Sequence, residues 1–307
     1  MRSPQEICPR AVIDSRGFVQ SPFPNLQWGG TVKTKNVRRS RQTLTYPKPM
    51  KRQLVSPLSA GFAVFAGLAA SLCAAESAKV LIYTRNHVTN GKGFVHDNIA
   101  TSVAAVKELC AEKNVACDAS DDPAVFTAEN LKQYKAVIFS NANNEAFSDP
   151  AQSKAFTAYI ENGGGFVGIH SASGSERKNP DFKRILGGTF KWHTPNQKFN
   201  VVVADKNNPA TASLPATWTW KDEGYLCDLV PGLHVLLEMD TTSVATPPRE
   251  KWALKFEGNR FPLAWCHEVG KGRSFYTALG HDKEAYADPA FRKHIQGGIF
   301  WVLGLAN

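Results

Sequence analysis

Histidine and carboxylate side chains able to do chemistry occur at the ends of apolar runs or between them. His170 and His281 each follow such a run, and His193 and Glu223 lie between them in the sequence. Imidazole acts as a base, an acid or a metal ligand near neutral pH. Three histidines and one carboxylate suit Zn²⁺, or another divalent ion such as Mn²⁺, with a position left open for substrate. We therefore expect these four residues to form one catalytic site, either as metal ligands or as a metal-free acid/base site; histidines bonded only to backbone are the alternative.

Aromatic and amide side chains near these residues suit a carbohydrate. Trp192 precedes His193 and Trp220 lies just before Glu223. An indole ring can stack on the apolar C–H face of a sugar, although core packing explains each tryptophan equally well. The side chains expected to contact substrate are Asn86, His96, Asn141, Ser171, Trp192, Trp220 and Tyr225.

Strands and helices that must position these residues are predicted to alternate in the first half of the chain. Apolar runs at 79–83, 115–117, 136–139 and 165–169 predict strands, and helical spacing predicts a helix over 97–113. A second helix is expected between Asp149-Pro150 and Asn162-Gly163. This alternation implies right-handed crossovers and an α/β fold with a mostly parallel sheet covered on both faces. Ligands bind at the carboxyl ends of such strands, which is where the polar residues occur.

The second half is less regular but continues the same domain. Strands are predicted at 199–203, 234–238, 252–256, 263–267 and 274–278. Gly270-Lys271-Gly272 predicts a hairpin turn, and Asp288-Pro289 begins a last helix that ends at Gly304. No linker separates the halves, so we expect one domain over 76–307.

The N-terminal part predicts export. Residues 50–75 run from Met50-Lys51-Arg52 through an apolar stretch to small residues before Glu76, the order found in a secretory signal peptide. This indicates a periplasmic or secreted protein with no stable membrane span after cleavage; an uncleaved anchor and lipidation at Cys73 are the alternatives. Residues 1–49 have no helical or strand period, and we interpret them as a disordered extension or a mis-called start.

The positive charge does not indicate a nucleic-acid partner. The chain has a formal net charge of +9, and all of this excess falls within residues 1–52. Residues 76–307 carry equal numbers of acidic and basic residues. A neutral folded part excludes the basic surface that nucleic-acid binding requires.

Cys110, Cys117, Cys227 and Cys266 remain after the predicted cleavage. No CxxC pair occurs, which argues against a structural zinc knot. An exported protein permits disulfides, but we expect buried free thiols, with Cys110 on the apolar face of its helix.

Several motifs together resemble the ThuA (trehalose utilisation) family. They are Phe94-Val-His-Asp97, Gly163-Gly-Gly-Phe-Val-Gly-Ile-His-Ser-Ala172, Lys221-Asp-Glu-Gly-Tyr225 and Gly270-Lys-Gly-Arg273 through Gly280-His-Asp282. The resemblance runs from about Lys79 to Leu303. The family belongs to the class I glutamine-amidotransferase-like superfamily, and the resemblance implies a flavodoxin-like three-layer sandwich.

The sequence departs from that superfamily at the nucleophile. Glutamine amidotransferases carry a cysteine in a Gly-x-Cys-x-Gly turn, and His170 stands at the corresponding position here. This excludes a glutaminase or cysteine-protease reaction at that position. Ser171 is not in the Gly-x-Ser-x-Gly motif of a serine hydrolase, so a serine hydrolase is a weaker alternative.

The resemblance implies chemistry on trehalose-like disaccharides and 3-keto-glycosides. A ketone at C3 acidifies the C2 proton, which His170 or His193 would remove, with Glu223 protonating the leaving oxygen and His281 as a ligand or second acid. A small carbohydrate substrate is therefore the expected partner. The alternative function is a non-catalytic carbohydrate-binding or accessory protein, which would need the tryptophans but not His170 and Glu223.

Overall fold

The structure is a computed structural model that describes residues 77–91, 93–245 and 258–306. The predicted leader at 50–75 and the predicted strand at 252–256 lie outside the described residues. Among the described residues, no helix has the length and apolarity needed to cross a membrane.

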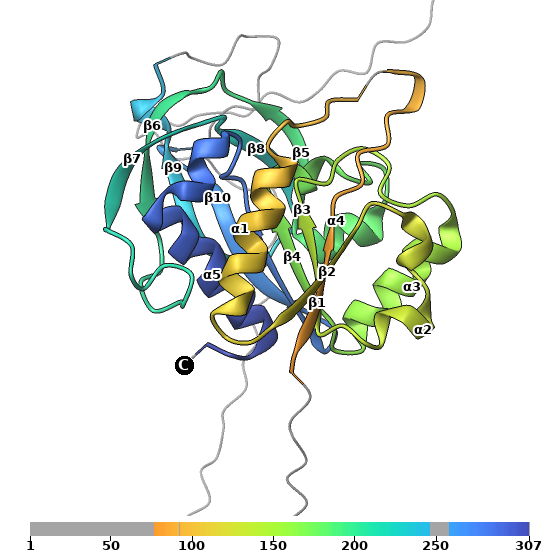
Figure 1. Ribbon diagram of the computed structural model, residues 1–307. Helices are drawn as coiled ribbons and strands as arrows, with labels where there is room; N and C mark the ends of the chain where they lie inside the picture. Colours follow the sequence, from red (N-terminus) through yellow and green to blue (C-terminus); the bar gives the residue numbers. More distant parts are fainter. Residues whose placement is uncertain (1–76, 92, 246–257, 307) are drawn as a thin grey trace, which may run out of the picture. The chain divides into compact units, whose positions relative to one another are not determined.

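A nine-stranded sheet runs through the domain in the order β2-β1-β3-β4-β11-β10-β9-β6-β7 (Figure 1). Its strands are β1 (Lys79–Tyr83), β2 (Ala116–Ser120), β3 (Ala136–Ser140), β4 (Gly165–Ile169), β6 (Gln197–Val203), β7 (Thr217–Asp222), β9 (His234–Asp240), β10 (Arg260–Val269) and β11 (Gly272–Thr277). The five from β2 to β11 pair in parallel, and β10, β9, β6 and β7 extend the sheet by antiparallel pairs. The expected α/β architecture with a parallel central sheet is confirmed, and an antiparallel extension completes it.

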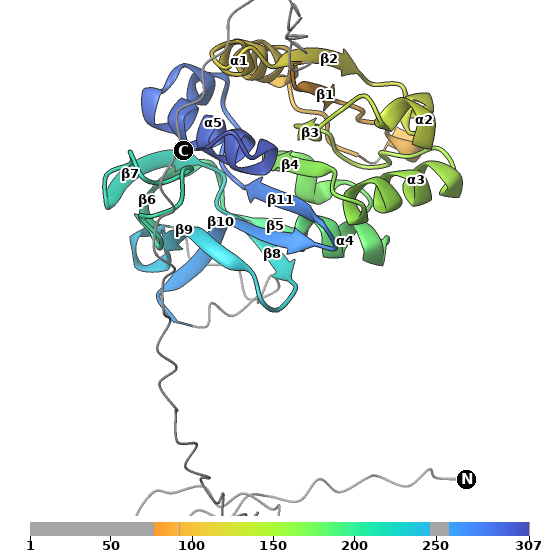
Figure 2. The ribbon, with the colours of Figure 1, turned by 90° about the horizontal axis from the view of Figure 1, so that it is seen from below.

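Helices cover both faces of the parallel strands (Figure 2). Helices α1 (Ile99–Ala111) and α5 (Pro289–Leu303) pack together on one face, while α3 (Pro150–Glu161) and α4 (Pro180–Leu186) pack together on the other. The short α2 (Ala128–Leu131) contacts α3. Every residue of β3 and β4 is buried, as expected for strands covered on both sides.

Local sequence signals explain where helices begin and turns form. The Asp149 side chain accepts hydrogen bonds from the backbone nitrogens of Ala151 and Gln152, and Gln152 completes a capping box ahead of α3. The hairpin between β10 and β11 turns at Gly270, whose φ of 61° and 2.7 Å approach of an added Cβ to the Glu161 carbonyl oxygen require glycine. Both predictions are confirmed.

Three strands and two helices, α2 and α4, were not predicted from the sequence. A separate two-stranded antiparallel sheet pairs β5 (Gly188–His193) with β8 (Tyr225–Leu229), and β7 forms the far edge of the main sheet. Helix α4 begins at Pro180, after the capping residue Asn179, and ends before Gly187 in the left-handed conformation; both are recognisable signals. These elements matter because β5, β7 and β8 carry side chains of the candidate site.

The four cysteines of the described part are free thiols. Cys110, Cys227 and Cys266 are buried and Cys117 is half-buried. Burial raises the pKa of Cys266 to about 11, so this thiol is protonated and unreactive at neutral pH.

Candidate functional site

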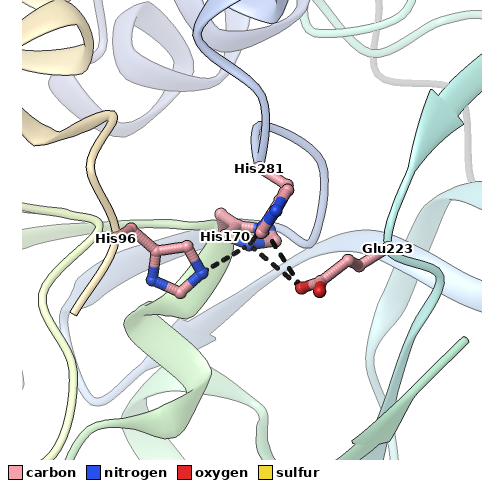
Figure 3. Close-up of side chains that lie close together, drawn as sticks. All are labelled: His96, His170, Glu223 and His281. Carbon is pink, nitrogen blue, oxygen red and sulfur yellow. Dashed lines mark hydrogen bonds and ion pairs between the residues drawn. The ribbon is translucent and has the colours of Figure 1, made fainter. Parts of the chain in front are cut away.

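Three histidines and a glutamate from distant parts of the chain meet at the carboxyl ends of the parallel strands (Figure 3). His170 follows β4, His281 follows β11, His96 precedes α1, and Glu223 lies in the turn between β7 and β8. One donor atom from each of the four lies within 4.8 Å of the others. The sheet topology thus brings together residues that are far apart in the sequence.

His170 lies at the centre of this cluster. Its Nε2 atom is 3.2 Å from His96 Nε2, 3.3 Å from His281 Nδ1 and 3.9 Å from Glu223 Oε2. Its backbone φ is +49°, a conformation uncommon for a residue with a side chain. A short 3-10 helix, His170–Gly174, begins directly after the strand. The chain therefore turns sharply at His170 and presents its imidazole at the strand end.

The hydrogen bonding of His170 fixes its tautomer. Nδ1 lies 2.7 Å from the carbonyl oxygen of Ala278, which can only accept a hydrogen bond, so Nδ1 carries the proton. Burial, followed by the nearby His96, lowers the pKa of His170 well below its ordinary value. The ring is therefore neutral and directs the Nε2 lone pair into the cluster.

The two neighbouring histidines have opposite shifts. Burial, followed by the charge of His281, lowers the pKa of His96 to about 4. The hydrogen bond from His281 Nδ1 to Glu223 Oε2, 3.2 Å long, raises the pKa of His281 above its ordinary value. His96 is thus neutral at physiological pH, while Glu223 favours a proton or another cation at His281.

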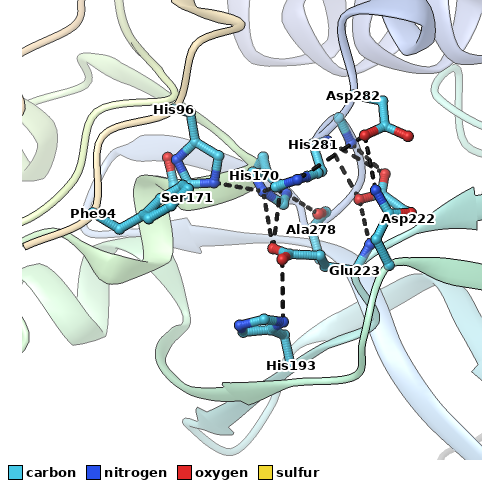
Figure 4. A network of polar contacts seen from close by, with 12 residues as sticks. Phe94, His96, His170, Ser171, His193, Asp222, Glu223, Ala278, His281 and Asp282 are labelled. Atoms are coloured by element: carbon cyan, nitrogen blue, oxygen red, sulfur yellow. Dashed lines mark hydrogen bonds and ion pairs between the residues drawn. The ribbon is translucent and has the colours of Figure 1, made fainter. Parts of the chain in front are cut away.

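Asp222 connects the two segments that carry Glu223 and His281 (Figure 4). Its fully buried carboxylate accepts hydrogen bonds from the backbone nitrogens of Gly280 at 2.8 Å, Glu223 at 2.8 Å and His281 at 3.3 Å. The indole nitrogen of Trp220 donates a fourth, at 2.9 Å. Burial raises the pKa of Asp222 to about 6. This residue was not among the predicted site residues, although it is adjacent to one of them.

His193 lies beyond Glu223 and outside the four-residue cluster. Its Nδ1 is 2.8 Å from the Thr194 carbonyl oxygen and 3.3 Å from Glu223 Oε1. Nδ1 therefore donates, and Nε2 carries the lone pair. The predicted metal set of His170, His193, Glu223 and His281 needs one correction, because His96 occupies the fourth position of the cluster and His193 does not reach it.

A cleft of ≈260 Å³ opens beside the cluster. Phe94, Phe190 and Tyr225 supply its aromatic surface, and His193 and Glu223 supply polar groups. A register shift between Phe190 and Trp192 places Phe190 opposite Cys227 and His193 opposite Tyr225. Because Tyr225 and Cys227 share one face of β8, the bulge turns both Phe190 and His193 toward the cleft.

Several predicted sugar contacts have a structural role. Trp220 is only 8% exposed, packs against Phe291 and donates to Asp222, so the prediction that it stacks on substrate is wrong. Trp192 pairs with Leu226 on the other face of the ribbon and does not line the cleft.

The predicted amides also bond within the protein. The Asn86 side chain donates to the carbonyl oxygens of Thr84 and Asn141 at 2.9 Å each. Fully buried Asn141 donates to the hydroxyl of Tyr286 at 2.7 Å. Both hold loops at the strand ends and do not line the cleft.

Of the residues expected to contact substrate, His96, Ser171 and Tyr225 line the cleft. Ser171 donates to the Ala142 carbonyl oxygen at 3.4 Å and is 1% exposed. Residues missed from the sequence are Phe94, Asn143, Arg177 and Phe190. Phe94 is 61% exposed, and no pattern distinguishes an exposed loop phenylalanine from a core residue before the fold is known.

The donor set of the cluster fits a divalent cation. A tetrahedral zinc site with bonds of about 2.0–2.1 Å separates its ligands by about 3.3 Å. Three of the contacts here measure 3.2, 3.3 and 3.2 Å. Imidazole and carboxylate groups are of the kinds that bind Zn²⁺ or Mn²⁺, and the hydrogen bond between His170 Nδ1 and a backbone carbonyl oxygen is of the kind that orients histidines in metal sites.

Comparisons with known proteins identify relatives of this fold. The chain matches a ThuA-like protein from Bacteroides uniformis ATCC 8492 at 26% identity and a TM-score of 0.57, covering 73% of this chain and 91% of that one. A ThuA-like protein from Parabacteroides merdae ATCC 43184 matches at 19% identity and a TM-score of 0.58, covering 75% and 91%. None of the curated proteins matches.

The family model for ThuA, described as trehalose utilisation, matches residues 79–302. That span begins at the first residue of β1 and ends inside α5, so it contains every residue of the cluster. The match gives the protein a carbohydrate-related role, and the chain belongs to the ThuA family.

Proposed function

We propose that this protein is an enzyme that cleaves the glycosidic bond of 3-keto-glycosides or related trehalose-like disaccharides by elimination and hydration. The observation that carries the proposal is that Glu223 belongs both to a buried cluster of imidazoles and to the lining of a cleft. The aromatic walls of that cleft suit a sugar ring.

His193 is the general base of the proposed reaction. It lines the cleft, and its Nδ1–H lies between the Thr194 carbonyl oxygen and Glu223 Oε1, which leaves Nε2 to accept a proton. Glu223 orients the ring and stabilises the imidazolium that forms. A carboxylate beside a histidine that must become charged is a recurring catalytic arrangement.

The steps balance without an external reagent other than water. His193 removes the C2 proton, which the C3 ketone acidifies, and an enediolate-type anion develops. The electron pair then forms the C1–C2 double bond as the C1–O bond breaks, and protonated His193 returns its proton to the departing oxygen. Water adds across the double bond, with its oxygen at C1 and a proton at C2, to complete a net hydrolysis.

His96, His170, Glu223 and His281 would hold a divalent ion beside this base. Such an ion would supply a Lewis acid that stabilises negative charge on a substrate oxygen. Glu223 then serves both parts of the site, because its two carboxylate oxygens face different histidines.

The proposal is tested with purified protein and 3-ketotrehalose. We expect release of glucose by the wild type and a loss of at least a hundredfold in His193→Gln, since a positioned general base contributes about 10²–10⁴-fold. Glucose release that is equal in the two proteins removes His193 as the base. Sugar binding without any turnover by wild-type protein favours the non-catalytic carbohydrate-binding alternative.

We also propose that residues 50–75 direct the chain to the periplasm. The order of basic, apolar and small residues in this stretch supports export. Mass spectrometry of protein from a periplasmic fraction is expected to find a new N-terminus near Glu76. Full-length protein confined to the cytoplasm would contradict the proposal.

A further inference from the structure

A second hollow adjoins the cleft. It has a volume of ≈460 Å³, and it shares Gly174 and Arg177 with the ≈260 Å³ cleft beside the histidines. The two spaces thus form neighbouring compartments that meet at these two residues. A ligand seated in the cleft has room to extend past Arg177.

The lining of the second hollow differs from that of the cleft. Besides the two shared residues and Gly93, it consists of polar or charged side chains: His87, Thr89, Asn144, Glu145, Glu176 and Lys178. None of these is a large apolar residue, whereas the cleft contains three aromatic rings. The second hollow therefore offers hydrogen-bond donors and acceptors without an apolar platform.

The acceptors are held in place by the protein. Glu145 accepts a hydrogen bond from the hydroxyl of Thr89, and His87 Nε2 lies 3.6 Å from its other oxygen. Glu176 Oε1 accepts from the backbone nitrogens of Ala146 at 2.9 Å and Phe147 at 3.1 Å. Arg177 and Lys178 line the same hollow and balance the charge of the two carboxylates, and the fixed carboxylate oxygens suit a neutral ligand that donates hydroxyl groups.

Arg177 stands at the boundary between the compartments. Its guanidinium lies 5.5 Å from the centroid of the Phe190 ring, and Nη2 is 3.4 Å from Asn143 Oδ1. Within the part of the chain that the structure describes, no carboxylate forms an ion pair with it. Its donors can therefore contact a ligand oxygen between the two spaces.

Backbone strain is concentrated around the same region. Asn144 and Glu176 adopt positive φ angles of 63° and 48°, as His170 does at the cluster. Positive φ angles are uncommon for residues with a side chain and persist where the surroundings fix them. The segments around Asn144 and Glu176, which line the second hollow, are thus held in a defined shape.

From these observations we propose that the second hollow is a sugar subsite, which binds the leaving half of a two-ring substrate. This inference rests on the proposed function, since the reacting ring is assigned to the histidine cleft. The linking oxygen lies near Arg177, and the second ring contacts Glu145 and Lys178. An aryl aglycone would find no apolar surface there, so the preferred leaving group is a neutral sugar.

Binding measurements test the subsite without requiring turnover. Calorimetry on wild-type protein uses trehalose, maltose and cellobiose, with methyl α-glucoside as the one-ring probe. We expect at least one disaccharide to bind about tenfold more tightly than the methyl glycoside, because hydrogen bonds to charged groups contribute that much or more.

Two variants test whether the tighter binding of the disaccharide comes from the second hollow. Thr89→Trp fills the hollow and is expected to abolish the disaccharide preference, and Lys178→Ala is expected to reduce it severalfold. Neither change is expected to alter affinity for methyl α-glucoside. Lys191→Ala is the matched control, because Lys191 is an exposed lysine that lines neither space and pairs with Asp228 at 3.4 Å.

Three results would overturn the subsite: no tighter binding of any disaccharide, no binding of any of the four sugars, or a preference that both variants leave intact. Failure of the proposed function has a different signature. In that case the disaccharide preference and its loss in Thr89→Trp persist, while 3-ketotrehalose yields no glucose.

Discussion

The buried carboxylate of Asp222 lies 2.8 Å from the backbone nitrogen of Gly280. The end of β7 is thereby tied to the loop that follows β11, although the two residues are 58 positions apart in the sequence. Since Glu223 and His281 are the next residues on each segment, this one side chain sets the distance between them.

Asp222→Asn is expected to weaken divalent-metal binding and activity about 10- to 100-fold, the usual effect of removing a residue that orients metal ligands. An amide nitrogen in place of one oxygen would face backbone N–H donors. Chelator competition for metal affinity, together with circular dichroism for folding, checks this. Asp240→Asn is the control, since Asp240 caps a surface turn, and equal metal affinity in both variants would contradict the positioning role.

His170→Asn is expected to remove a bound divalent ion while keeping the fold. Asparagine tolerates the positive φ at this position, whereas alanine would be strained. Metal analysis of purified protein should find close to one ion per chain in the wild type and little in the variant. His234→Asn, a change in an exposed histidine paired with Asp205 at 3.0 Å, should retain the ion. Equal metal content in wild type and His170→Asn would refute the proposed ligand set.

Phe94→Ala is expected to weaken sugar affinity about tenfold, or about 1.4 kcal/mol, by removing an aromatic wall of the cleft. The free energy of unfolding should change little, because the side chain is 61% exposed. Val95→Ala is the control, as Val95 is also exposed but does not line the cleft. Calorimetry with methyl α-glucoside distinguishes them, and identical affinities would assign Phe94 no role in binding.

Buried His294 should make the free energy of unfolding depend on pH. Burial lowers its pKa to about 4 in the folded protein, whereas an unfolded histidine titrates near 6.5. The unfolded state therefore binds more protons between these values, and stability is complete above about pH 6.5 and falls as the pH drops toward 4. The loss approaches roughly 3 kcal/mol.

Comparison with His294→Asn isolates this contribution. The asparagine amide can replace the donor that His294 Nδ1 offers to the Ala210 carbonyl oxygen, and it does not titrate. Denaturant unfolding with a chelator present, at several pH values between about 4.5 and 7.5, should give a shallower pH slope for the variant. If the free energy of unfolding had the same slope against pH in wild type and His294→Asn, His294 would not control this pH dependence.

Asp149→Ala should lower the free energy of unfolding by about 1 kcal/mol through loss of the capping box of α3. Asp181→Ala is the matched change, because its pair with Arg184 is exposed and such pairs contribute little. Both variants should retain sugar binding. If Asp181→Ala lowered the free energy of unfolding as much as Asp149→Ala, the capping argument would be contradicted.

The first half of the fold was predictable because its signals are local. The continuous apolar runs of β1, β3 and β4 are what strands covered on both faces require, and Asp149 marks a helix start by its own hydrogen bonds. The β5–β8 ribbon was missed because a bulge at Phe190–Trp192 interrupts the regular alternation of its side chains. The alternation of Thr and Trp in β7 is a period-two signal that is typical of a strand.

The candidate site was predictable in part for the same reason. Residues directly after strands, such as His170 and His281, must lie at one edge of a parallel sheet. The exchange of His96 for His193 in the cluster was not predictable, because it depends on how the loop before α1 and the ribbon fold over that edge. Trp220 was misassigned because a strand tryptophan suits either a core or a binding surface, and only burial decides between them.

The β5–β8 ribbon is hydrogen-bonded as its own sheet, separate from the nine strands that carry His170 and His281. Phe190 and Tyr225 can thus be exchanged for other residues without breaking a ladder contact of the large sheet. This wall of the cleft can in this way change without altering the strands that precede His170 and His281, whereas His193, the last residue of β5, depends directly on the geometry of the ribbon.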